Sequence, residues 1–151
     1  MIMTDLLLAI LHHLLVFGLA GILFAEFALL KPGLGGRNLS LLGRLDGAYG
    51  GLSMAIIIVG VCRVIFGLKG WEYYVGNHAF WGKMAAFLVV GLLSIPPTLR
   101  IIKWRRAAAS STDYAVPDSE IASMRRYVHG EMAFFALILV FAAMMARGYG
   151  A

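Results

Sequence analysis

The sequence is poor in the residue types on which many soluble folds and enzyme motifs depend. It has one cysteine, Cys62, which excludes a disulfide within the chain and a zinc site of the cysteine–histidine type. It has no Gly-rich phosphate loop and no nucleophile elbow. Charged residues make up 14% of the chain, against ~25% in soluble domains, and this deficit excludes an ordinary soluble domain.

The chain is rich instead in long hydrophobic segments. Hydrophobic residues make up 61% of it and the mean hydropathy is +0.84. About 20 apolar residues, at ~1.5 Å rise each, cross the ~30 Å hydrocarbon core of a bilayer. The sequence therefore predicts an all-α integral membrane protein, a four-helix transmembrane bundle that forms a single domain over residues 1–151. The spans are expected at about residues 5–30, 45–68, 78–104 and 118–147.

Basic residues predict how the bundle is oriented. Nine of them lie in or beside the first and third connections: Lys31, Arg37, Arg44, Arg100, Lys103, Arg105, Arg106, Arg125 and Arg126. The opposite side has only Lys69 in its loop and Arg147 in the tail. The positive-inside rule therefore places both chain ends outside, in a multi-pass protein with N-out and C-out topology. Because the basic residues flank spans, the net charge of +5 does not indicate a nucleic-acid partner. The first block lacks a basic n-region and is too long for a signal-peptide core, so we expect it to remain as a helix.

Several polar residues share one depth in the outer half of the predicted bundle. His12, Arg63 and Lys83 each lie five to seven residues from a predicted outer helix end, roughly 7–11 Å below the surface at ~1.5 Å per residue. His78 lies just above them. A site and a plainer role both remain open for each. His12 can form a hydrogen bond across helices, Arg63 and Lys83 can extend their charges to the interface, and His78 can be interfacial.

A second polar layer is predicted toward the cytoplasmic side, formed by Glu26, Asp46, Tyr49, His129 and Glu131. Ionisable groups inside a membrane are costly, and they indicate a functional site by default. On that reading Glu26, His129 and Glu131 form a proton relay. On the other reading, Glu26 pairs with Arg44 or Arg100, and His129 and Glu131 belong to a solvated helix start.

A histidine inside a four-helix membrane bundle is typical of proteins that bind b-type haem. A neutral imidazole ligates the iron, and a basic side chain can neutralise the propionates. His12 suits the metal ligand, Lys83 or His78 a second ligand, and Arg63 the propionate partner. The covalent CxxCH attachment motif is absent. The leading prediction is thus a redox protein that binds haem b, an oxidoreductase in the broad sense, whose partners would be a redox protein or a porphyrin ligand.

Other functions remain open at this stage. The thioethers of Met144 and Met145, at the depth of His12, suit copper, so a copper- or metal-handling protein is one alternative. A transporter, a proton-relay bundle and a purely structural bundle in the lipid bilayer are others. Gly50 and Gly51 suit contacts within the bundle or between the subunits of a homo-oligomer.

Segments across nearly the whole chain carry a resemblance to known families. LHHLLVFGLAGILFAE, FWGKMAAFLVVGLLSIPPTLR and the closing MARG resemble a family of small bacterial membrane proteins of unknown function, which implies the bacterial inner membrane. Leu11-His12 before Ala20-Gly21, and Trp81 before Lys83, are more distantly similar to the small bacterial membrane protoporphyrinogen IX oxidases. That resemblance implies b-type haem, with functional residues at His12 and Lys83. The Trp–Lys spacing is shorter here, and this chain has four predicted spans rather than five. Copper-resistance membrane proteins share a looser likeness.

Overall fold

The fold is a bundle of four long helices joined at one end by a short fifth one. A computed structural model describes residues 2–150 of the chain. The helices it contains are α1 (Ile2–Leu29), α2 (Gly36–Phe66), α3 (Gly70–Val75), α4 (His78–Ser110) and α5 (Asp118–Ala146). All except α3 are long and apolar enough to cross a membrane. The prediction of an all-α bundle with four candidate spans is confirmed.

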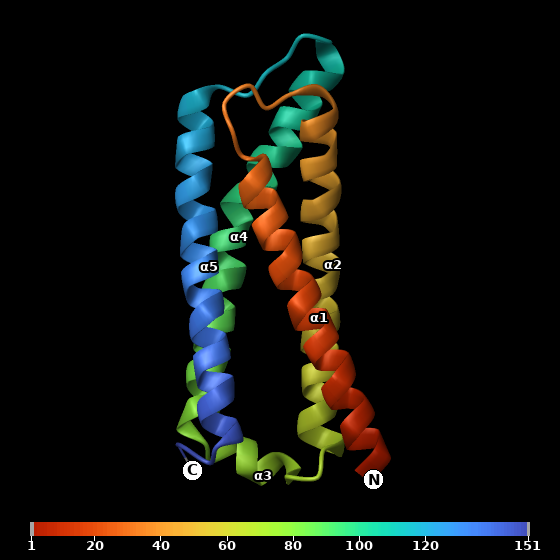
Figure 1. Cartoon of the computed structure of the whole chain (residues 1–151), viewed down its shortest axis with the longest axis vertical. Coiled ribbons are helices and arrows are strands. Elements are labelled where there is room, and N and C mark those ends of the chain that lie inside the picture. The colour runs from red at the N-terminus through yellow and green to blue at the C-terminus, as the bar shows by residue number, and fades with distance from the viewer. Residues whose placement is uncertain (1, 151) are drawn as a thin grey trace.

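The bundle is built from two helix pairs. α1 packs mainly along α2, and α4 packs mainly along α5, whereas contacts between the two pairs are fewer. In Figure 1 the pairs come together at the end that carries the α1–α2 and α4–α5 loops, and they diverge toward the end that carries α3. Both chain ends lie at the α3 end. The two pairs therefore pack less closely against each other than the helices do within each pair.

Side-chain burial follows what a lipid environment requires. Leu19 and Leu23 of α1 and Trp104 of α4 are buried between helices, whereas Leu14 and Phe17 are 65% and 69% exposed. A helix that is hydrophobic all round is typical of a membrane span, because lipid covers whatever the bundle does not. The exposed apolar side chains are therefore the lipid-facing surface.

Three elements differ from the sequence-based expectation. α2 begins at Gly36 rather than near residue 45, because Leu39 and Leu42 are buried at helical spacing while Arg37 and Arg44 are exposed. α4 continues to Ser110, beyond the predicted end of the span at about residue 104. The indole of Trp104 donates a hydrogen bond to Glu120 at 2.5 Å, which ties these extra turns to α5. α3 forms in the connection between the predicted spans at 45–68 and 78–104, where no helix was expected.

Hydrogen bonds tie the two pairs together at the end that carries their loops, and at the other end they tie α3 to α5. At one end, Gly35 pairs with Ala115 in an isolated bridge, and the Val116 N–H donates to the Leu34 carbonyl at 2.8 Å. At the α3 end, the Tyr73 hydroxyl donates to the Met145 carbonyl at 2.9 Å, and the Asn77 side chain caps α4 by accepting from the Phe80 N–H. Hydrogen bonds therefore hold the bundle at its ends, and between the ends the two helix pairs can lie farther apart.

Gly35→Ala is expected to weaken the tie between the pairs. A Cβ at Gly35 would lie 2.7 Å from the Tyr114 carbonyl oxygen, so the two loops must separate. We expect a loss of about 1–3 kcal/mol in the free energy of unfolding, measured by denaturant titration in detergent. Gly47→Ala is the control, because a Cβ there meets no atom within 4 Å. Equal stability of the two variants would contradict the role of this bridge.

Candidate functional site

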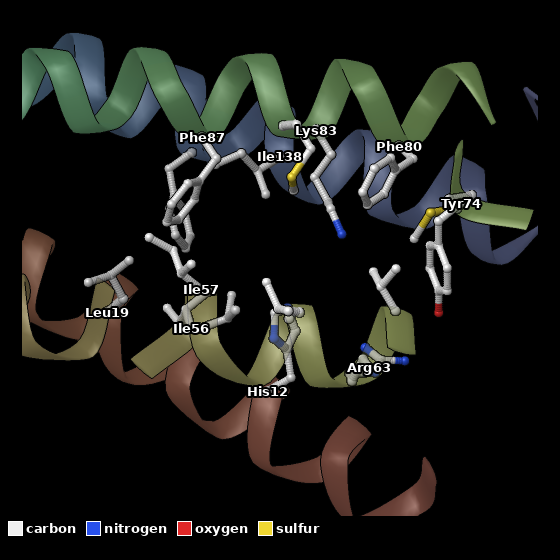
Figure 2. Close-up of a pocket in the computed structure, with 17 residues that line it drawn as sticks. His12, Leu19, Ile56, Ile57, Arg63, Tyr74, Phe80, Lys83, Phe87 and Ile138 are labelled. Atoms are coloured by element: carbon white, nitrogen blue, oxygen red, sulfur yellow. The ribbon is translucent and has the colours of Figure 1, made fainter. Parts of the chain in front are cut away.

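A cavity of about 300 Å³ lies between the two helix pairs, in the half of the bundle nearer α3. Figure 2 shows it between α1 and α2 on one side and α4 on the other. Its walls are apolar and aromatic, and include Leu19, Ile56, Ile57, Phe80, Phe87 and Ile138. Such a cavity suits the apolar body of a ligand that arrives from the bilayer.

Three of the polar residues that the sequence placed at one depth line this cavity. His12 comes from α1, Arg63 from α2 and Lys83 from α4. In Figure 2 the Lys83 ammonium group extends from α4 toward His12 across the cavity, and Arg63 lies farther toward Tyr74. The described residues that line the cavity include no carboxylate. The cavity therefore carries two basic side chains with no acidic partner in its wall.

Two of these side chains also have a polar atom that lacks a hydrogen-bond partner. His12 Nδ1 and Arg63 Nε are buried and unpaired in the part of the chain that the structure describes. The His12 ring packs against Gly60 of α2, where an added Cβ would lie in ordinary van der Waals contact with His12 Cε1, at 3.6 Å. Buried polar atoms in proteins are nearly always paired, so each exception needs an explanation. A ligand bound in the cavity would explain both unpaired atoms, His12 Nδ1 and Arg63 Nε.

Lys83 contacts an aromatic ring. Its Nζ atom lies 5.5 Å from the centroid of the Phe80 ring, within the range of a cation–π interaction. This interaction offsets part of the cost of placing an ammonium group among apolar side chains, but it leaves all three N–H donors free for a ligand.

Other predicted site residues lie outside the cavity. His78 is exposed at the first position of α4, and its backbone N–H donates to the Gly150 carbonyl at 2.7 Å. Met145 lines the cavity, whereas Met144 is 38% exposed and does not. His13, next to His12, is exposed, and its Nδ1 lies 2.6 Å from the Ala9 carbonyl oxygen.

Tyr74 is a cavity residue that the sequence reasoning missed. It is buried and lines the cavity from α3, although it lies in a connection outside the predicted spans. α3 has six residues, too few for a hydrophobic period to indicate which side chain turns inward. Only the packing of α3 across the end of the bundle reveals it.

The second polar layer is formed by partly different residues from those predicted. Glu26 and Glu131 are buried, at 5% and 2% exposure, and the Tyr49 hydroxyl donates to Glu131 Oε2 at 2.9 Å. Thr98, which the sequence reasoning did not consider, donates to Asp46 Oδ1 at 2.8 Å. These residues bring α1, α2, α4 and α5 together at one level of the bundle.

His129 and the arginines expected near Glu26 are placed elsewhere. His129 is exposed, with its ring 4.5 Å from that of Phe27 and its Nδ1 2.9 Å from the Arg125 carbonyl oxygen. Arg44 is exposed, and Arg100 Nη1 is buried without a partner. The structure therefore pairs Glu26 with neither arginine.

The donor set limits which metals the chain could bind on its own. Among residues 2–150, no three or more histidine, cysteine, aspartate or glutamate side chains are grouped so as to hold a metal ion. A metal at the cavity would need His12 together with a thioether, or a cofactor that brings its own donor atoms.

Comparison with known proteins identifies a family. A family model described as "Predicted membrane protein (DUF2214)" matches residues 4–150, which is nearly the whole chain. No curated protein and no solved structure matches the chain.

Replacing His12 by leucine is expected to stabilise the protein in the absence of ligand. The change removes a buried, unpaired nitrogen that costs about 1–3 kcal/mol, and it fills the same space with an apolar side chain. We expect a rise of about 1–2 kcal/mol in the free energy of unfolding, measured in detergent without added cofactor. His13→Leu is the matched control and should change stability little. A destabilised His12→Leu variant would indicate that the imidazole serves packing rather than ligand binding.

Proposed function

The chain belongs to the DUF2214 family of predicted membrane proteins, and we propose that it binds haem b in the cavity between its two helix pairs and acts as a redox protein. One observation carries this proposal: unpaired nitrogen atoms of His12 and Arg63 occur in residues that line one apolar cavity without a carboxylate. Imidazole is the most common protein ligand of haem iron, and a guanidinium pairs well with the carboxylate of a propionate.

The residues of the cavity fit this cofactor in polarity and donor chemistry. The walls offer aromatic and aliphatic surface from Phe80, Phe87 and Ile57, which suits a porphyrin macrocycle. The volume of about 300 Å³ is at the lower end of the ~300–1,000 Å³ typical of ligand pockets. A macrocycle therefore needs the helix pairs to move apart, and their sparse mutual contacts support that movement. When bound, the haem supplies one-electron redox chemistry.

Each polar residue of the cavity has a role in this proposal. His12 would ligate the iron from α1, and Lys83, which faces it from α4, would serve as a second ligand or as a hydrogen-bond donor. Arg63, nearer the end of the bundle, would neutralise a propionate. The exposed position of His78 assigns it no part in the site.

The proposal predicts an absorption spectrum that depends on His12. Protein purified after haem supply should show a Soret band, which His12→Ala should abolish and His13→Ala should retain. Arg63→Leu should keep the band but weaken haem affinity about 10–100-fold, because it removes one charge-assisted interaction. A colourless wild-type protein after haem supply would refute the proposal.

Copper handling is the second candidate, and Met145 is the observation that favours it. This thioether lines the same cavity as His12. The two residues offer an imidazole nitrogen and a thioether sulfur, and both kinds of donor suit copper. Metal analysis of the same preparations distinguishes the two. One result would favour copper over haem: the wild-type protein contains stoichiometric copper and shows no Soret band. The copper should then be lost in both His12→Ala and Met145→Leu.

The orientation of the protein is part of the proposal. We place it in the inner (cytoplasmic) membrane of a bacterium, as a multi-pass protein with both termini on the outer face. Both chain ends lie at the α3 end, and Arg37, Arg44, Arg105 and Arg106 lie on the segments at the opposite end. The positive-inside rule assigns that opposite end to the cytoplasm.

Cysteine labelling tests this orientation. In a Cys62→Ser background, Tyr149→Cys should react with a membrane-impermeant thiol reagent applied to intact spheroplasts. Thr112→Cys, in the loop between α4 and α5, should react only after the membrane is opened. The reverse pattern would overturn the orientation.

A further inference from the structure

Three carboxyl groups from three helices lie inside the bundle, outside the wall of the cavity that His12, Arg63 and Lys83 line. Glu26 of α1 and Glu131 of α5 are 5% and 2% exposed, and Asp46 of α2 is half-buried. Tyr49, one turn from Asp46 on α2, donates a hydrogen bond to Glu131 of α5, so Asp46 and Glu131 lie at the same level of the bundle. Glu26 Oε1 is buried with no hydrogen-bond partner. We call Glu26, Asp46 and Glu131 the acidic cluster.

The side-chain hydrogen bonds to the acidic cluster come from hydroxyl groups. Tyr49 of α2 donates to Glu131, and Thr98 of α4 donates to Asp46. Arg125 of α5 donates to the Leu30 carbonyl at 2.7 Å and lies 4.0 Å from the centroid of the Phe27 ring. Its side-chain hydrogen bonds therefore go to backbone carbonyls and not to the cluster. Arg100 of α4 lies over the Tyr127 ring at 5.7 Å, and its Nη1 atom is buried without a hydrogen-bond partner.

We propose that the acidic cluster is a proton-binding site, in which Glu26 is held as a neutral carboxylic acid. Carboxylates that share a site without a cation cannot all be ionised at low cost. A proton on Glu26 Oε1 removes one negative charge and turns an unpaired acceptor into a donor toward a neighbouring carboxylate. The O–H bond forms with a proton taken from water, and the proton returns to water when it breaks.

Proton rather than metal is the occupant that the geometry favours. The described residues contain no group of three carboxylate or histidine side chains placed to hold a metal ion, so the cluster is too open for one. A proton needs only one oxygen and one acceptor. The cluster also lacks His129, whose exposed ring would have offered a route from the surface.

A hollow lies beside Asp46. The hollow has a volume of about 390 Å³, and its wall is mostly apolar, with polar groups from Asp46, Tyr49, Ser53, Ser94 and Thr98. A water molecule in a protein needs room and two to four polar partners, and this side of the hollow offers both. Asp46 lines this hollow and Glu26 does not, so Asp46 is the member of the cluster that exchanges protons with the hollow.

The hollow also adjoins the cavity of the proposed cofactor. Ile57 and Phe87 line both spaces, so these two side chains form the wall between the acidic cluster and the basic cavity. The proton site does not depend on the cofactor, and it is tested on protein without haem.

Infrared spectroscopy of the full-length protein in lipid nanodiscs tests the proton directly. At neutral pH, exposed carboxyl groups are ionised, so a carboxylic-acid C=O band reports a carboxyl held neutral by its surroundings. We expect this band in the wild type, its loss in Glu26→Gln and its retention in Glu72→Gln, an exposed control in α3. Absence of the band in folded wild-type protein overturns the proposal, whether or not any variant folds. The proposal is also overturned if the band remains in each of the three variants Glu26→Gln, Glu131→Gln and Asp46→Asn.

Deuterium exchange tests the access through the hollow. Transfer into heavy water should shift the C=O band quickly in the wild type. Gly91→Leu, which fills the hollow at a position where an added Cβ meets no atom within 4 Å, should slow that shift at least tenfold. Gly21→Leu, an open position on α1 that does not line the hollow, is the control. An unchanged rate in Gly91→Leu would overturn the assignment of the hollow as the route.

Discussion

The structure depends on one constraint: lipid cannot solvate a charge, so every ionisable side chain in a span must find protein or a polar space. His12, Arg63 and Lys83 face a space between helices rather than the bilayer. Apolar side chains such as Leu14 and Phe17 occupy the lipid-facing surface instead. An unpaired ionisable group in a membrane costs several kcal/mol, and so three of them around one cavity make it the candidate site of this bundle.

The two-pair architecture explains why space is available at all. α1 with α2, and α4 with α5, each form a closely packed unit, and hydrogen bonds join the units at both ends. Between the ends the units touch less, so the cavity and the hollow both lie along the seam that separates them. Regions with fewer apolar contacts open at lower free-energy cost, and ligand sites are commonly drawn from them.

The seam has two polar regions of opposite character that do not neutralise each other. The cavity holds basic groups without a carboxylate in its wall, and the acidic cluster holds carboxyls whose side-chain partners are hydroxyls. Ile57 and Phe87 stand between the two spaces. Direct ion pairs between these regions would have neutralised the charges of both. Their separation by two apolar side chains leaves the basic region free for an anionic ligand group and the acidic cluster free for a proton.

The sequence by itself determined the four spans and the common depth of His12, Arg63 and Lys83, because hydrophobic length and the rise per residue of a helix follow from local geometry alone. Tertiary structure decided which polar side chains face the same space. It placed His129 outside the bundle and Tyr74 within the cavity wall. Rotation of a helix about its axis, and the choice of its neighbour, depend on contacts between residues far apart in the chain. No local pattern in the sequence encodes those contacts. The depth of a residue in the membrane was therefore predictable, whereas the direction in which its side chain points was not.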